Sequence, residues 1–206
     1  MVLHDRSIVP GVELVSELGR GAGSVVYLAR RDGRDYAVKL VRALGSEADT
    51  VAFRREAALL ASMDHSALAR IHELGRTGDT PYLIMDLIEG RSLTAVLADG
   101  VLAETEAVDL VAQVAGALSV AHRAGLVHRD VKPDNIMIRP DGRVCLIDFG
   151  LATRAGVDAA DTAVGTFVYS APEQTGMLRR VVDGRADLYS LGVVLFESPA
   201  LPGPER

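Results

Sequence analysis

The sequence has little of what marks an exported or membrane-bound protein. It contains a single cysteine, Cys145, so no intramolecular disulfide can form, and a lone cysteine in an apolar stretch is expected to be a small buried hydrophobe. The longest strongly apolar stretch, Leu191 to Phe196, is far shorter than the roughly 20 residues of a membrane-spanning helix. No basic start followed by an apolar run precedes Pro10. These absences predict a cytoplasmic location and no membrane segment in this chain.

Long positively charged runs are missing as well. Lysine and arginine never cluster five or six at a time, and 28 acidic residues face 22 basic ones for a formal net charge of -6. The sequence therefore predicts no nucleic-acid partner and no anionic-membrane partner. With 206 residues, 49% of them hydrophobic, the chain can bury one good core or two small lobes that share an interface.

The chain divides into two halves of different rhythm. In the first, up to about Leu87, short apolar segments are punctuated by glycines, which is typical of β-strands. The segments are Val12 to Leu18, Val25 to Ala29, Asp35 to Val41, Ala69 to Leu74 and Pro81 to Leu87. We expect a five-stranded antiparallel sheet, with one helix between the third and fourth segments, where apolar residues recur near helical spacing from Ala52 to Met63.

Helices dominate from Ser92 onward. The clearest runs from about Glu104 to Ala124, and its apolar face is predicted to hold Val108, Val111, Ala115, Leu118 and His122. Strands first and helices afterwards predict an α+β chain of two lobes. The expected boundaries are residues 1–87 for the N-terminal lobe, 88–197 for the C-terminal lobe and 198–206 for a proline-rich tail.

A glycine-rich turn joins the first two predicted strands. Gly19, Gly21 and Gly23 let the backbone approach a phosphate closely, although such a turn alone also fits an ordinary β-hairpin. A dinucleotide-binding fold would place a helix after the glycines, and the phosphate loop G-x-x-x-x-G-K-[ST] does not occur. Because a strand follows instead, a phosphate-covering hairpin is the functional interpretation.

Lys39 lies inside the third predicted strand, and Glu56 lies on the predicted helix. A strand lysine is ordinarily a solvated residue. Held by a helical carboxylate, it would instead be aimed at the phosphates of ATP. Each of these two residues therefore makes the other more credible.

The strongest pattern is His128-Arg129-Asp130-Val131-Lys132-Pro133-Asp134-Asn135, followed by Asp148-Phe149-Gly150. Gly165-Thr166, Ala171-Pro172-Glu173 and Asp187-Leu188-Tyr189-Ser190-Leu191-Gly192 come next, in that order. With the glycine turn, these motifs resemble those of the bacterial type of eukaryotic-like serine/threonine protein kinases. The resemblance implies a small antiparallel β lobe with one helix and a larger, mainly helical lobe.

The resemblance also implies a chemical role for four polar residues. Asp130 would accept or orient the proton of the substrate hydroxyl, and Lys132 would reach the transferred phosphate. A lysine at this position of the motif is typical of serine/threonine kinases. Asn135 and Asp148 would give oxygen ligands to Mg²⁺. The implied phosphate donor is ATP, and the implied acceptor is a protein with a serine or threonine hydroxyl.

Five further residues receive supporting roles from the resemblance. Asp187 would brace the backbone of the catalytic loop, Thr166 would help to seat the acceptor, and Glu173 normally pairs with an arginine from later helices. Arg129 is a ready partner for a phosphate on the activation segment, where Thr162 is the first candidate for phosphorylation.

The nucleotide pocket is likewise implied only by the resemblance, since each of its apolar residues also fits an ordinary core. Its roof is Leu18, Val26 and Ala37, its floor Met137, its gatekeeper Met85 and its hinge Asp86 and Ile88. Gly19, Gly21 and Lys39 would hold the phosphates.

Two departures from the family pattern affect what we expect. Ser24 stands where the third glycine is usual, but Gly23 keeps the loop flexible. The family's domain continues through several more helices, whereas here the tail at 198–206 carries three prolines. We therefore expect the C-terminal helices to be missing and an apolar helix from about Asp183 to Glu197 to have an uncovered flank. Either self-association covers this flank or the larger lobe is loose, and we expect the loose lobe.

Three function classes remain open at this point. The first is an active serine/threonine kinase, and the second is a nucleotide-binding regulatory relic with little or no turnover. The third is a small-molecule kinase, which would share the catalytic aspartate and the asparagine. Thr166 and Ala171-Pro172-Glu173 argue against the third class, because they belong to a segment that receives protein substrates.

Overall fold

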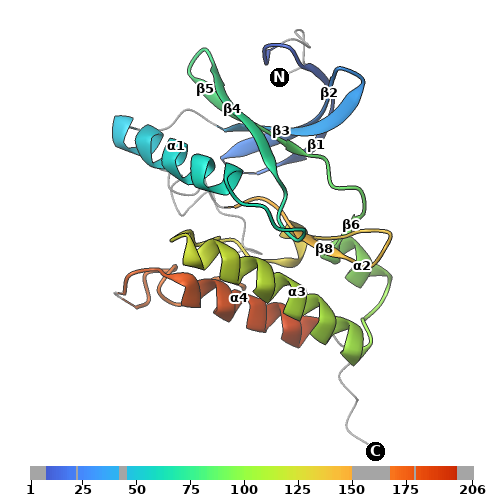
Figure 1. Ribbon diagram of the computed structural model, residues 1–206. Helices are drawn as coiled ribbons and strands as arrows, with labels where there is room; N and C mark the ends of the chain where they lie inside the picture. Colours follow the sequence, from blue (N-terminus) through green and yellow to red (C-terminus); the bar gives the residue numbers. More distant parts are fainter. Residues whose placement is uncertain (1–7, 22, 42–45, 150–167, 179, 199–206) are drawn as a thin grey trace, which may run out of the picture. The chain divides into compact units, whose positions relative to one another are not determined.

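The computed structural model describes residues 8–21, 23–41, 46–149, 168–178 and 180–198 (Figure 1). These residues form two compact units. The first contains the described residues up to Asp64 together with Ala69–Ile88, and the second contains His65–Leu68, Glu89–Phe149 and the described residues from 168 onward. Each unit has its own sheet.

The first unit consists of one sheet and one helix. Its elements are β1 (Glu13–Arg20), β2 (Ser24–Arg31), β3 (Arg34–Val41), α1 (Glu47–Ala61), β4 (Ile71–Thr77) and β5 (Thr80–Asp86). The strands are antiparallel, in the order β1-β2-β3-β5-β4. This confirms the predicted five-stranded antiparallel sheet with its single helix.

The two faces of this sheet differ because side chains alternate along each strand. One face packs on an apolar cluster, whose buried members are Val9, Val12, Leu14, Tyr27, Ala29, Val38, Tyr82 and Ile84. On the other face, strand pairing sets Lys39 between Val26 and Leu83, and Ala37 beside Met85. Only 3% of the surface of Lys39 is exposed. Lys39 is therefore not the solvated strand lysine that the sequence left open.

Helix α1 begins at a side-chain cap and packs on the edge strand β4 (Figure 1). The hydroxyl of Ser46 accepts a hydrogen bond from the backbone N–H of Asp49 at 3.1 Å, which satisfies one of the orphan donors of the first turn. Phe53, Ala57 and Leu60 are the buried residues of the helix. Glu56 lies three and four residues from Phe53 and Leu60, so it belongs to this same buried side.

The described residues of the second unit form four helical segments and three short strands. Its elements are β6 (Arg91–Ser92), α2 (Leu93–Asp99), α3 (Glu104–Arg123), the 3₁₀ turn η1 (Pro133–Asn135), β7 (Ile136–Ile138), β8 (Val144–Leu146) and α4 (Gly184–Glu197). The strands pair antiparallel in the order β6-β7-β8. Gln113 of α3 accepts a hydrogen bond from the N–H of Val144 at 2.9 Å, which ties this small sheet to α3.

Helices α3 and α4 lie side by side and run antiparallel (Figure 1). The start of α3 meets the end of α4, where the N–H of Leu102 donates to the carbonyl of Ser198 at 2.9 Å. The buried side of α3 consists of Ala107, Leu110, Val114, Ala117, Leu118 and Ala121. The predicted apolar face was right at Leu118, which is buried, and wrong at Val108, which is 54% exposed. Val111, Ala115 and His122 are half-buried. Val108 marks the error most clearly. It lies one residue, or about 100°, away from the true seam, where alanines allow close packing.

Helix α4 has one buried side and one exposed apolar side. Ala186, Leu191 and Val194 are buried, whereas the large side chains of Leu188, Tyr189 and Phe196 are exposed. An uncovered flank was expected on this helix, and the residues in it are now specified. Among the helices that the structure describes, none is long and apolar enough to span a membrane.

Gly90, between β5 and β6, provides a test of how this part of the second unit is packed. Its φ is +145°, and a Cβ there would overlap the backbone carbonyl oxygen of Ile138. We expect Gly90→Ala to lower the free energy of unfolding by about 2–4 kcal/mol, because the strain and the backbone overlap cannot be relieved by moving a side chain. Urea unfolding followed by circular dichroism measures the loss.

Gly142 is the matched control. Its φ is +78°, but a Cβ there would meet nothing within 4 Å. Gly142→Ala should cost only the left-handed strain of about 1–2 kcal/mol. Equal losses for the two variants would show that the approach of Ile138 to Gly90 contributes nothing.

Candidate active site

Two side chains of the catalytic-loop motif, those of Asn135 and Lys132, converge on the carboxylate of Asp130. The amide nitrogen of Asn135 donates to the Asp130 carbonyl at 2.7 Å and to its Oδ2 at 2.9 Å. The Nζ of Lys132 lies 2.9 Å from the same Oδ2. Pro133 begins the 3₁₀ turn η1, which ends at Asn135, so the tight turn returns the amide to the aspartate five residues earlier. Asp130 is thereby oriented by two donors.

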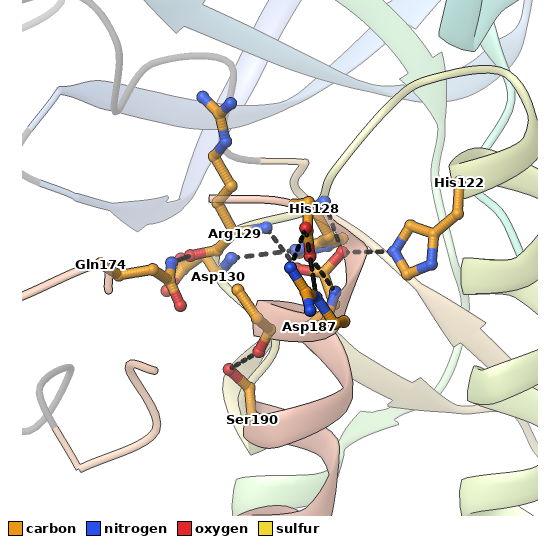
Figure 2. Close-up of polar contacts among 10 residues, drawn as sticks. His122, His128, Arg129, Asp130, Gln174, Asp187 and Ser190 are labelled. Carbon is orange, nitrogen blue, oxygen red and sulfur yellow. Dashed lines mark hydrogen bonds and ion pairs between the residues drawn. The ribbon is translucent and has the colours of Figure 1, made fainter. Parts of the chain in front are cut away.

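The backbone that carries Asp130 is held by Asp187, the fourth residue of α4. The Asp187 carboxylate accepts hydrogen bonds from the N–H of His128 at 2.8 Å and from the N–H of Arg129 at 2.7 Å (Figure 2). Asp187 has no exposed surface. A buried carboxylate requires such donors, since an unpaired buried charge is very costly. The loop and the helix therefore fix each other.

His122, at the end of α3, adds a third contact to the same carboxylate. Its Nε2 lies 2.7 Å from Oδ2 of Asp187 (Figure 2). Gly184 makes this approach possible, because a Cβ at residue 184 would lie 2.7 Å from the imidazole ring. The end of α3 and the catalytic loop thus meet at one carboxylate that lies 58 to 65 residues further along the chain.

His128 is completely buried and acts through its ring nitrogens. Its Nδ1 accepts a hydrogen bond from the N–H of Asp130 at 3.2 Å, and its Nε2 lies 3.1 Å from the carbonyl of Ile147. A ring that accepts at Nδ1 and donates at Nε2 is neutral. Burial lowers the pKa of His128 below its usual value, against the opposing effect of Asp187 and Asp130. Phe149 packs on the ring, with 4.5 Å between ring centroids.

Two residues of the motifs have left-handed backbones. The φ angles are +67° at Arg129 and +64° at Asp148, a region that costs a non-glycine residue about 1–3 kcal/mol and is found preferentially at functional sites. Asp148 follows Ile147, whose N–H donates to the carbonyl of Asn135 at 2.9 Å. This hydrogen bond links the backbones on which Asn135 and Asp148 lie.

The donor set fits Mg²⁺ with a nucleotide better than a metal held by protein ligands alone. Because the Asn135 nitrogen is directed at Asp130, the amide oxygen is the atom that Asn135 offers to a cation. Mg²⁺ is usually bound by one or two protein oxygens together with phosphates and water. Within the part of the chain that the structure describes, no group of three or more His, Cys, Asp or Glu residues could hold a metal ion.

Comparison with known families matches the protein kinase domain to residues 12–201. The chain belongs to the protein kinase family. It is 38% identical over 199 residues to the serine/threonine-protein kinase PknB of Mycolicibacterium smegmatis, covering 90% of this chain and 32% of PknB. It is 39% identical over 190 residues to the serine/threonine-protein kinase PknL of Mycobacterium tuberculosis, covering 88% of this chain and 47% of PknL. The kinase chain thus spans about a third to a half of these curated relatives.

Solved structures show the same kinase fold. A crystal structure of the PknI kinase domain of M. tuberculosis is 30% identical, with a TM-score of 0.74, and the match covers 96% of this chain and 78% of that one. The predicted α+β kinase fold, with its antiparallel β lobe and its mainly helical lobe, is therefore confirmed. ATP and Mg²⁺ are the standard cofactors of the serine/threonine protein kinases that the chain resembles.

The structure places the residues of the implied kinase nucleotide pocket as follows. Val26, Ala37, Lys39 and Met85 share one face of the first unit's sheet. Leu18, Gly19 and Gly21 lie at the end of β1 or just after it, Asp86 ends β5 and Ile88 follows it. Met137 lies on β7 of the second unit, paired with Cys145. Thr162 and Thr166 lie outside the described residues.

Glu173 has no arginine partner among the residues that the structure describes. The pKa of Arg185 is raised mainly by its hydrogen bond to Asp183, and Glu173 contributes only through space. The pairing that kinases normally give to this glutamate is therefore not made in this part of the chain.

Two residues that contact the catalytic loop or its anchor Asp187 were not identified in these roles from the sequence. Gln174 donates from Nε2 to the carbonyl of Arg129 at 2.8 Å, and His122 was predicted only as part of an apolar helix face. The position of Gln174, directly after Ala171-Pro172-Glu173, was the one signal that could have indicated it.

The buried His128 predicts a pH dependence of stability. In the unfolded chain a histidine takes up a proton near pH 6.5, whereas the folded, buried ring does so only at lower pH. Between these pKa values the unfolded state binds more protons, so the free energy of unfolding falls as the pH falls below about 6.5, by at most about 1.4 kcal/mol per pH unit. Urea unfolding between pH 7.5 and 5 measures this slope.

His128→Phe is the control, because it removes the titrating group and keeps an apolar ring beside Phe149. The stability of wild type relative to this variant should fall as the pH is lowered. A pH-independent difference would contradict the buried neutral imidazole.

Proposed function

We propose that the chain is a serine/threonine protein kinase, which transfers the γ-phosphate of ATP to a protein hydroxyl with Mg²⁺. The observation that carries the proposal is the geometry around Asp130. Its Oδ2 lies 2.9 Å from both Asn135 Nδ2 and Lys132 Nζ, and its backbone is anchored through His128 and Arg129 to the buried Asp187. This arrangement supports the proposal that the Asp130 carboxylate is oriented to accept a hydrogen bond from a substrate hydroxyl group.

Each residue then has a defined task in the proposed reaction. Asp130 orients the acceptor hydroxyl and accepts its proton, and Lys132 neutralises charge on the transferred phosphate. Asn135 and Asp148 hold Mg²⁺, which neutralises the charge of the ATP phosphates when it is bound. Lys39, buried on β3, binds the phosphates of ATP. Catalysis of this kind depends on positioning and electrostatics rather than on a covalent intermediate.

Three structural observations support a protein acceptor over a small molecule. The Ala171-Pro172-Glu173 segment is hydrogen-bonded to the catalytic loop through Gln174. Tyr169, at its start, donates to Glu197 of α4 at 2.6 Å. Ser190 of α4 donates to the carbonyl of Tyr169 at 2.7 Å. A segment fixed in this way near Asp130 offers a surface on which a peptide can bind. The curated relatives named above are serine/threonine-protein kinases, which also favours a protein acceptor.

Replacing Asp130 tests the proposed activity. We expect Asp130→Asn to lower kcat by about 10²–10⁴-fold, because the amide cannot accept the hydroxyl proton. The measurement is magnesium-dependent transfer of labelled phosphate from ATP to the chain itself and to myelin basic protein.

Asp134→Asn is the control, because it replaces another aspartate of the same loop by asparagine, at an exposed position. This variant should retain activity. If wild type transfers no phosphate to either acceptor, the chain is the regulatory relic that the sequence left open. If Asp130→Asn is as active as wild type, the catalytic assignment is wrong.

Replacing Asp148 tests nucleotide binding without requiring turnover. Mg-ATP should raise the melting temperature, because a ligand at 100 times its Kd adds about 2.7 kcal/mol to the native state. We expect Asp148→Ala to abolish the dependence of this shift on magnesium. Equal magnesium-dependent shifts for wild type and Asp148→Ala in differential scanning fluorimetry would exclude Asp148 as a metal ligand.

The remaining expectations stay predictions. We propose Thr162 as the first site of regulatory phosphorylation with Arg129 as its partner, and Thr166 as a residue that seats the acceptor. We also retain the proposed domain boundaries at residues 87 and 197, the cytoplasmic location and a loose larger lobe, with self-association through the exposed flank of α4 as the alternative. That flank carries Leu188, Tyr189 and Phe196, and an apolar patch of this kind favours association.

A further inference from the structure

The backbone of Arg129 is held from both sides by side chains of other segments. Its N–H donates to Oδ1 of Asp187 at 2.7 Å, and its carbonyl accepts from Nε2 of Gln174 at 2.8 Å (Figure 2). Asp187 and Gln174 lie 58 and 45 residues away from Arg129 in sequence. Because Arg129 has a φ of +67°, its conformation must be imposed by such contacts.

Gln174 is itself oriented, so its amide presents the donor and not the oxygen to Arg129. Its Oε1 accepts a hydrogen bond from the N–H of Ala171 at 3.0 Å, which leaves Nε2 directed at the catalytic loop. The segment that carries it is fixed to α4, because the carbonyl of Tyr169 accepts from Ser190 at 2.7 Å and its hydroxyl donates to Glu197 at 2.6 Å. Burial, with the hydrogen bond to Glu197, raises the pKa of Tyr169 and keeps this donor protonated.

The peptide plane between Arg129 and Asp130 includes the carbonyl that Gln174 binds. The orientation of this plane sets the direction in which the side chain of Asp130 leaves the backbone. The N–H of the same plane donates to His128 Nδ1 at 3.2 Å. The carbonyl of this plane thus accepts from Gln174, and its N–H donates to His128, so both of its polar groups are held by side chains. Loss of the Gln174 contact would let Arg129 relax from its left-handed conformation and turn Asp130.

We propose that Gln174 is a positioning residue for Asp130, which couples the Ala171-Pro172-Glu173 segment to the catalytic loop. Gln174 completes the clamp on Arg129 that Asp187 begins. The inference rests on the proposed function for the role of Asp130 in phosphate transfer. It requires no contact between Gln174 and either substrate.

Gln174→Glu tests the clamp with a minimal change. A carboxylate can still accept from the N–H of Ala171, but it presents an oxygen to the carbonyl of Arg129, where Gln174 presents a donor. We expect the amides of His128, Arg129 and Asp130 to exchange hydrogen about tenfold faster, the amides of α3 to be unaffected, and kcat toward myelin basic protein to fall about tenfold with the KM for ATP within about twofold. Residue-resolved hydrogen exchange and steady-state kinetics on the full chain measure these effects.

Thr175→Val is the matched control. Thr175 lies in the same turn and donates from Oγ1 to the carbonyl of Pro172 at 2.9 Å. This variant should leave the exchange of the catalytic loop and kcat at wild-type values. Gln174→Met, which removes both amide contacts, should match or exceed the effects of Gln174→Glu.

The possible results separate the two proposals. Wild-type exchange at His128 to Asp130 in Gln174→Glu would overturn the clamp, and so would equally fast exchange in Thr175→Val or in α3, which would indicate general loosening. Absence of phosphate transfer by wild type would contradict the proposed function, and the exchange measurement would still decide whether Gln174 holds the loop.

Discussion

The carboxylate of Asp187 is the interaction on which the candidate site depends. It is completely buried and accepts from the backbones of His128 and Arg129, with His122 as a third neighbour. Removing a carboxylate from water is costly, so the fold must provide donors for it, and the donors it provides are the backbone amides that precede Asp130. The requirement to satisfy one buried charge thus gives the loop its shape, and the antiparallel packing of α3 on α4 brings the groups together.

The first unit also buries a charged residue, in this case a lysine. Lys39 is buried in the middle of a sheet, on the face that also carries Val26, Ala37 and Met85. The apolar core of the sheet lies on the other face. Alternation along the strands therefore separates the residues that stabilise the unit from those assigned to the nucleotide, so the two sets can change independently.

Local sequence patterns made many of the helices, strands and candidate site residues predictable. The five strands, α3 and α4 could be located from apolar periodicity and glycines, and Asp130, Asn135 and Asp148 stood in motifs whose spacing alone is specific. The seam of α3 could not be located, because the buried alanines, such as Ala107, are less apolar than the exposed Val108. Gln174 could not be recognised either, since its role arises from a contact between segments 45 residues apart. Pairings of this kind are created by the tertiary fold.

The distance along the chain between the catalytic loop and its anchor affects how the protein is made. During synthesis, the amides of His128 and Arg129 are made before the Asp187 carboxylate that binds them, which lies 59 and 58 residues further along the chain. At a synthesis rate of about 5–20 residues per second, this delay lasts about 3–12 s. During that interval a nascent chain holds the sequence of the catalytic loop without the group that shapes it. The order of synthesis therefore places assembly of the site after the larger part of the β-rich unit has left the ribosome.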